Sequence, residues 1–137
     1  MTTDWASTPF FKHFGLVLEE TREGYARLSI RRDVVRLRGA RDSINGGLLA
    51  ALGNAAMHVC LGTMLGEGER VGRTHELSVA YLSSARGDVT SLEARILRKG
   101  GRQAVGEIEV RDTADGAINA KLRVTCEIER VTNQDAN

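Results

Sequence analysis

One long apolar segment limits the possible folds of this chain more than any other feature. It runs from Leu48 to Leu65 and follows directly on Asn45-Gly46-Gly47. Its length approaches that of a membrane span, but polar residues and glycines interrupt it, which favours a buried helix. Its apolar residues fall on nearly every side of that helix, so we expect other structure to enclose it. Asn45 is the expected N-cap, and a glycine of Gly66-Glu67-Gly68 is the expected left-handed C-cap.

The rest of the sequence predicts mainly strands, because apolar and polar residues alternate along it. A short helix is expected at Pro9–Phe14, since proline favours the first turn of a helix. Glycine-containing turns such as Lys99-Gly100-Gly101-Arg102 join the later strands as hairpins. Antiparallel strands around one enclosed helix define an α+β domain. The expected strands are Leu16–Leu18, Tyr25–Arg31, Thr74–Leu82, Val89–Arg98, Gln103–Arg111 and Ile118–Ile128.

Length and composition indicate one domain over residues 1–137, with a core from about residue 9 to 130. A formal net charge of +1 and few aromatic residues argue against a nucleic-acid binder. Cys60 and Cys126 are far apart and lack a CxxC spacing, which favours two reduced, buried thiols. The N-terminus has no basic segment followed by an apolar run, as a signal peptide would. We therefore expect a cytoplasmic protein that does not bind a membrane.

The segment from Asn45 to Ala56 resembles the HGGxxxxLxDxA signature of hotdog-fold acyl-CoA thioesterases, and the phenylacetate-degradation branch looks closest. Thr74–Leu82, Arg98–Arg102 and Val110–Asp112 resemble later strands and a hairpin of that family, so the resemblance covers about Phe10 to Ile128. It implies a hotdog fold, in which an antiparallel sheet wraps around one long helix. It also implies homodimers with one continuous sheet, often paired into tetramers, and active sites at the dimer interface.

The resemblance further implies how an acyl-CoA thioester would be held. Backbone N–H groups of Gly46 and Gly47 would polarise the thioester carbonyl, a role that suits the unpaired donors and positive end of a helix. Thr74 aligns with a Ser or Thr position that helps to hold the attacking water. In the family, two loops lie near coenzyme A. They correspond here to the stretch from Ser83 to Gly87 and to the basic hairpin Arg98–Arg102. The expected substrate-binding residues are Asn45, Ser83, Arg86, Arg98, Lys99 and Arg102.

Two departures from the family signature affect its catalytic positions. Asn45 replaces the histidine before the glycine pair, and Asn54 replaces the helix carboxylate that acts as base or nucleophile. A third family position, often asparagine, falls at Gly39. Asparagine can orient water or hold a thioester by hydrogen bonds, but it cannot accept a proton or attack as an anion. Three interpretations stay open: a substitute base, a protein that binds acyl-CoA without hydrolysing it, or an engineered change.

Three residues are candidates for the substitute base. His58 lies four residues after Asn54 on the same helical face and titrates near neutrality. It could equally be a histidine packed in the helix. Asp42 could supply a carboxylate or serve as a loop or capping residue, and Glu76 could act from a strand or be a structural carboxylate of the sheet.

The sequence thus predicts an acyl-CoA thioesterase for a small or aromatic acyl group, with Gly46, Gly47, Asn54, Thr74 and His58 at the catalytic centre. The alternative is a non-hydrolytic acyl-CoA binding or regulatory protein of the same fold. No metal or prosthetic group is expected, because the histidines are dispersed and no ligand spacing appears. Self-association and acyl-CoA are the expected partners. Residues expected to shape the acyl pocket are Leu48, Met57, Leu61 and the Phe10–Phe14 segment.

Overall fold

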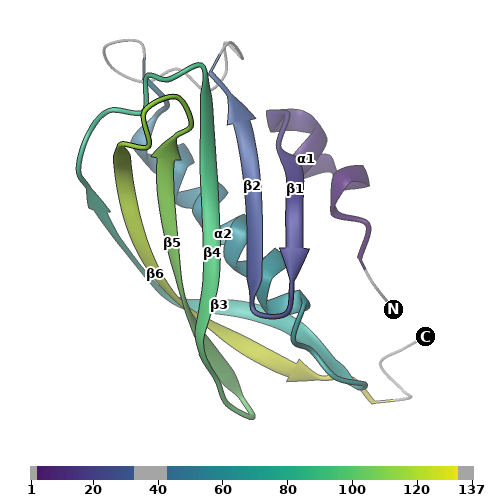
Figure 1. The fold of residues 1–137 in the computed structure, drawn as a ribbon. Coiled ribbons are helices and arrows are strands. Elements are labelled where there is room, and N and C mark those ends of the chain that lie inside the picture. Colours follow the sequence, from purple (N-terminus) through teal and green to yellow (C-terminus); the bar gives the residue numbers. More distant parts are fainter. Residues whose placement is uncertain (1–2, 33–42, 133–137) are drawn as a thin grey trace.

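The computed structural model describes residues 3–32 and 43–132, which form one antiparallel sheet with helix α2 lying across one of its faces (Figure 1). The six strands are ordered β1-β2-β4-β5-β6-β3, so β1 and β3 are the edges. This confirms the predicted α+β architecture. The elements are η1 (Trp5–Ser7), α1 (Pro9–Phe14), β1 (Val17–Arg22), β2 (Tyr25–Arg31), α2 (Gly46–Gly62), β3 (Glu69–Tyr81), β4 (Val89–Lys99), β5 (Gln103–Asp112) and β6 (Ile118–Arg130).

The core lies between α2 and the inner face of the sheet. Alternate residues of β4, β5 and β6 point to the helix and are buried, as the alternation predicts. Two glycines bring the layers close together. A Cβ on Gly53 would lie 2.5 Å from Leu122 Cδ2, and a Cβ on Gly106 of β5 would collide with the Met57 side chain. Both side chains are themselves fully buried, so neither has free space to move into.

Three predicted boundaries are wrong. Helix α2 ends at Gly62, not at a glycine of Gly66–Gly68, because Thr63 caps it in a right-handed conformation and its hydroxyl donates to Cys60 O at 2.6 Å. Gly68 instead takes a φ of 76° in the turn before β3. Strand β3 begins five residues before the expected Thr74, and β1 extends to Arg22. Both extensions consist mostly of charged and polar residues, with Val71 the single large apolar one, so alternation of hydrophobic residues does not reveal them.

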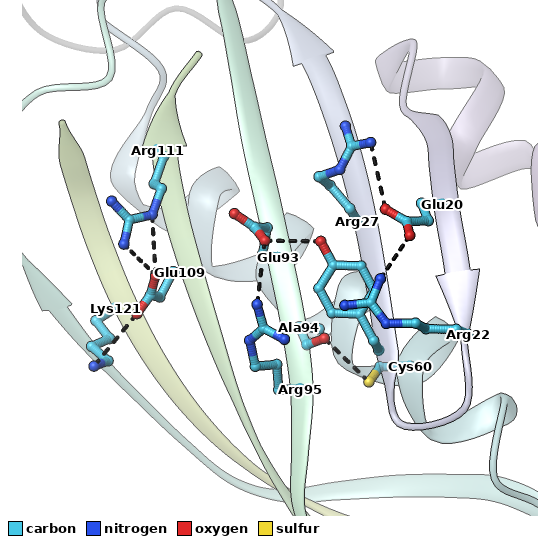
Figure 2. Close-up of polar contacts among 11 residues, drawn as sticks. Glu20, Arg22, Arg27, Cys60, Glu93, Ala94, Arg95, Glu109, Arg111 and Lys121 are labelled. Carbon is cyan, nitrogen blue, oxygen red and sulfur yellow. Dashed lines mark hydrogen bonds and ion pairs between the residues drawn. The ribbon is translucent and has the colours of Figure 1, made fainter. Parts of the chain in front are cut away.

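The outer face of the sheet carries charged side chains in small networks (Figure 2). Tyr25 Oη donates to Glu93 Oε2 at 2.8 Å, and the guanidinium of Arg22 lies 3.8 Å from the centre of the Tyr25 ring. Farther along the sheet, Glu109 pairs with Arg111 at 2.6 Å. Neighbouring charges of opposite sign therefore satisfy one another on this face, in contrast to the apolar face under α2.

The described residues of this chain leave one side of helix α2 uncovered. We call its uncovered side the open stripe, which consists of Ala51, Asn54, Ala55 and His58 and is half-buried or exposed. The short elements η1 and α1 face this stripe across a cavity. The opposite side, the core stripe, is fully enclosed and consists of Leu49, Leu52, Gly53, Ala56, Met57 and Cys60.

The two cysteines are free and buried, as predicted. Cys60 Sγ donates to Ala94 O at 3.4 Å (Figure 2). Burial raises the pKa of this thiol to about 11. Over the described part of the chain, no helix has the length and apolar character needed to cross a membrane.

Candidate active site on helix α2

The first turn of α2 offers two unused backbone donors. Asn45 caps the helix as predicted, because its Oδ1 accepts from Leu48 N at 3.0 Å. The N–H groups of Gly46 and Gly47 have no acceptor among the described residues, as expected for the first positions of a helix. The positive end of the helix dipole lies at the same place. This end of α2 can therefore bind a developing negative charge on oxygen.

Tyr81, at the end of β3, holds this first turn in place. Its Oη donates to Gly46 O at 2.5 Å, and its ring would lie 3.2 Å from a Cβ added to Gly46. A larger residue at position 46 would therefore push the ring away. A cavity of about 320 Å³ opens beside this contact, lined by residues of the helix start and of the segment after β3. They include Ser43, Ile44, Gly46, Leu49, Tyr81, Leu82, Ser83, Ser84 and Ala85.

The predicted catalytic side chains Asn54, Thr74 and His58 form one hydrogen-bonded chain. Thr74 Oγ1 donates to Asn54 Oδ1 at 2.7 Å, and Nε2 of His58 lies 3.1 Å from the same Oγ1. Helix α2 supplies two of these residues at the spacing of one turn, and β3 supplies the hydroxyl. Burial lowers the pKa of His58, so its imidazole is neutral at physiological pH. The structure thus joins three residues whose proximity the sequence only suggests.

This polar chain lies at the wall of an apolar cavity of about 320 Å³. Phe10 and Phe11 line the cavity, as expected for the acyl pocket, whereas Met57 and Leu61 belong to the core. The sequence interpretation missed several lining residues, although two of them lie one turn from Asn54 and His58 and could have been found from helical spacing. The missed residues are Trp5, Thr8, Ala51 and Ala55.

The predicted coenzyme A contacts fall at two opposite ends of the sheet. Ser83 and Arg86 follow β3, near the start of α2, whereas Arg98, Lys99 and Arg102 surround the hairpin between β4 and β5. Figure 1 shows that hairpin at the other end of the sheet.

Two of these side chains already have partners within the chain. The hydroxyl of Ser83 donates to Ile118 O at 3.0 Å, and Lys99 Nζ lies 3.2 Å from Glu69 Oε1. Arg86, Arg98 and Arg102 are exposed.

The other sequence candidates do not join this site. Glu76 is exposed on β3 and makes no hydrogen bond with Asn54 or His58 among the contacts of the described residues. Asp42 and Gly39 lie outside the described residues. Within residues 3–32 and 43–132, no group of three or more metal-ligating side chains is close enough to hold a metal ion.

The two halves of this site are too far apart to act on one thioester within a single chain. Gly47 and Asn54 are separated by seven residues of α2, which corresponds to about 10 Å along the helix axis. A reacting carbonyl carbon has to lie roughly 3 Å from both the nucleophile and the oxyanion donors. The helix start and the open stripe of one chain therefore cannot meet at a single carbonyl group.

The architecture, with a six-stranded antiparallel sheet against one long helix, is the hotdog fold of acyl-CoA thioesterases. A family model described as the Thioesterase superfamily matches residues 42–119, and the chain belongs to this family. The phenylacetic acid degradation protein PaaI of Escherichia coli has the same fold, with a TM-score of 0.80 at 17% identity, covering 93% of this chain and 91% of PaaI.

Two other relatives agree with this assignment. The medium/long-chain acyl-CoA thioesterase YigI of Salmonella typhimurium is 29% identical, with 76% of each chain covered. The crystal structure of thioesterase HI1161 from Haemophilus influenzae superimposes with a TM-score of 0.84 at 18% identity, covering 93% of this chain and 87% of that one.

Proposed function

We propose that this protein is an acyl-CoA thioesterase that hydrolyses its substrate to a free carboxylic acid and coenzyme A. The observation that carries the proposal is the Asn54–Thr74–His58 chain at the wall of an apolar cavity, within a Thioesterase superfamily fold. Such a site can hold a water molecule on its polar side and an acyl group on its apolar side.

The helix start supplies the oxyanion donors that the reaction needs in addition to a positioned water. The N–H groups of Gly46 and Gly47 receive the thioester oxygen and stabilise the negative charge that develops on it. Asn54 and Thr74 position the attacking water by hydrogen bonds, since neither side chain can take up its proton. Removal of one oxyanion donor typically costs roughly 100–1000-fold in kcat.

A homodimer through the free edge of β3 would complete the site. Strand β3 pairs with β6 on one side only and is thirteen residues long, whereas the other edge strand, β1, has six residues and is mostly charged or polar. Long unprotected edges favour pairing with another chain. Thr74 lies next to the middle residue of β3. A two-fold axis at that middle residue would therefore bring the hydrogen-bonded Asn54, Thr74 and His58 side chains of the two copies close to each other.

The same pairing accounts for the separation of the predicted coenzyme A contacts. Tyr81, at the end of β3, touches the start of α2, and Glu69, at the beginning of β3, pairs with Lys99 of the basic hairpin. In an antiparallel β3–β3 pair, the beginning of one strand lies beside the end of the other. The hairpin of one copy would thus approach the helix start of its partner, where Arg98 and Arg102 suit the phosphates of coenzyme A.

The aromatic lining of the acyl cavity favours a phenyl-bearing or medium-length acyl group. Trp5, Phe10 and Phe11 border it, and Ala51 and Ala55 leave room beside the helix. The name of the YigI relatives states a medium- or long-chain substrate. We further propose that the protein works in the cytoplasm without a metal or prosthetic group, and its two free thiols support a reducing compartment.

Steady-state hydrolysis of an acyl-CoA panel tests this function. The panel runs from acetyl-CoA to palmitoyl-CoA with phenylacetyl-CoA and benzoyl-CoA, and a thiol-trapping dye reports released coenzyme A. We expect turnover above about 1 s⁻¹ on at least one member, which is within the usual range of enzymes. Saturable binding without turnover would instead favour a non-hydrolytic acyl-CoA binding protein, the function suggested by Asn54 in place of a carboxylate.

A further inference from the structure

We propose that His58 is the catalytic base of this enzyme and that its Nδ1 atom removes a proton from the attacking water. The inference rests on the proposed thioesterase function and identifies the group that replaces the carboxylate absent at position 54. It follows from the hydrogen bonds of His58, from the cavity that it borders and from its surroundings.

The hydrogen bonds determine which nitrogen of His58 is free. Asn54 Oδ1 can only accept, so the single hydroxyl proton of Thr74 is used in the 2.7 Å bond to it. The 3.1 Å contact between Thr74 Oγ1 and His58 Nε2 must then be donated by the histidine. Neutral imidazole carries one N–H, so Nδ1 holds the lone pair. Nδ1 has no hydrogen-bond partner among the described residues.

His58 also borders the cavity in which the acyl group would lie. It lines this cavity together with Asn54, Ala51 and Ala55 of the open stripe and with aromatic residues of η1 and α1. A water molecule bound in this cavity would lie next to both His58 and Asn54, because both residues line it. The same cavity provides the apolar surroundings that keep His58 neutral and able to act as a base.

No charged side chain of the described residues opposes this role. Burial is the single cause of the lowered pKa of His58. None of the titratable groups on the surrounding elements contributes to the shift. They include Asp4 before η1, Lys12 and His13 on α1, Arg73, His75 and Glu76 on β3, and Cys126 and Glu127 on β6. His75 is instead paired with Glu127 Oε2 at 3.3 Å.

The reaction balances with His58 as the only proton carrier. Nδ1 takes a proton from the water while the water oxygen forms a bond to the thioester carbonyl carbon. The electron pair of the C=O bond moves to the carbonyl oxygen, which the helix start holds. When this intermediate collapses, the C–S bond breaks. Nδ1–H then returns its proton to the departing sulfur. The products are the carboxylic acid and coenzyme A, and Thr74 and Asn54 keep the imidazole oriented throughout.

The test compares His58→Gln with a matched control, His13→Gln, in the full chain, since His13 is exposed on α1 and does not line the cavity. General-base catalysis typically contributes 10²–10⁴-fold, so we expect kcat of His58→Gln to fall by about that factor. The acid limb of the kcat/KM profile, centred below the usual histidine pKa of about 6.5, should disappear with it. His13→Gln should keep both the rate and the limb, and circular dichroism and thermal melting should show that both variants fold.

A second measurement uses the unaltered protein and does not depend on the folding of a variant. The ¹⁵N chemical shifts of His58 should show a protonated Nε2 and an unprotonated Nδ1 at neutral pH. The opposite tautomer, or unchanged hydrolysis and an unchanged acid limb in a folded His58→Gln, would overturn the role of His58 and leave the thioesterase function standing. Absence of hydrolysis by the unaltered protein would overturn both.

Discussion

The two sides of helix α2 differ in what they contribute. The core stripe is sealed against the sheet, where Gly53 and Gly106 allow Leu122 and Met57 to pack without space to spare. The open stripe is half-exposed, carries Asn54 and His58, and borders a cavity. One side of the helix thus packs in the core, and the other side carries the polar residues of the proposed active site. Substitutions on the first should change stability, and substitutions on the second should change rate.

The largest expected effect comes from a cavity in the core stripe. Leu52→Ala removes a side chain that is fully buried, so we expect the free energy of unfolding to fall by about 2–5 kcal/mol. Leu48→Ala, at a half-buried position on the same helix, is the matched control and should cost clearly less. Urea denaturation followed by circular dichroism measures both. Equal losses for the two variants would contradict the distinction between the sides of α2.

The next effect concerns the exposed start of the helix. Gly47→Pro deletes a backbone N–H that has no partner inside the helix, and proline is tolerated in the first turn. We expect kcat to fall roughly 100–1000-fold while the melting temperature changes little. Gly47→Ala keeps the N–H, although its Cβ would lie 3.3 Å from Asn45 Oδ1, and should retain most of the activity. If both variants lose activity equally, the N–H of Gly47 is not an oxyanion donor.

The substitution Asn54→Asp places a negative charge on the open stripe. A carboxylate beside the imidazole stabilises its protonated form and should raise the pKa of His58 by about one to three units. The acid limb of kcat/KM should therefore move upward by the same amount, because the neutral base is then lost at a higher pH. Above this limb, kcat/KM should rise, since the carboxylate can also act as a base. An unmoved limb and no gain, with folding preserved, would count against the placement of the site.

The two sides of α2 also differ in how well the sequence predicts them. The core stripe and the strand faces were predictable because burial repeats with the period of the helix or strand. The grouping of Asn54, Thr74 and His58 was expected from the family resemblance alone. Their hydrogen bonds were not predictable from periodicity, because Thr74 lies on a strand twenty residues away and two irregularities in the β3–β6 pairing set its position. The end of α2 was missed because Thr63 caps the helix through its own hydroxyl, a contact that a glycine-based rule does not consider.

The smallest expected effect lies far from both sides of the helix. Arg102→Gln removes an exposed charge from the β4–β5 hairpin and should raise KM for acyl-CoA about two- to fivefold, as expected for an exposed ion pair worth under about 1 kcal/mol. The value of kcat should not change, and the difference should shrink at high salt. Arg70→Gln, at an exposed arginine paired with Glu129, is the control. An equal rise in KM for both variants would mean that general surface charge is responsible.

The central claim is that the helix start of one copy acts with the open stripe of another. Co-expression of Gly47→Pro and His58→Gln chains under two different affinity tags tests it most directly, with the fraction of mixed dimers measured by native mass spectrometry. Each variant alone should be nearly inactive. Random mixing should restore about one quarter of the unaltered activity, because about half of the dimers are mixed and each carries one intact site of two. Mixed dimers without restored hydrolysis would contradict a shared site.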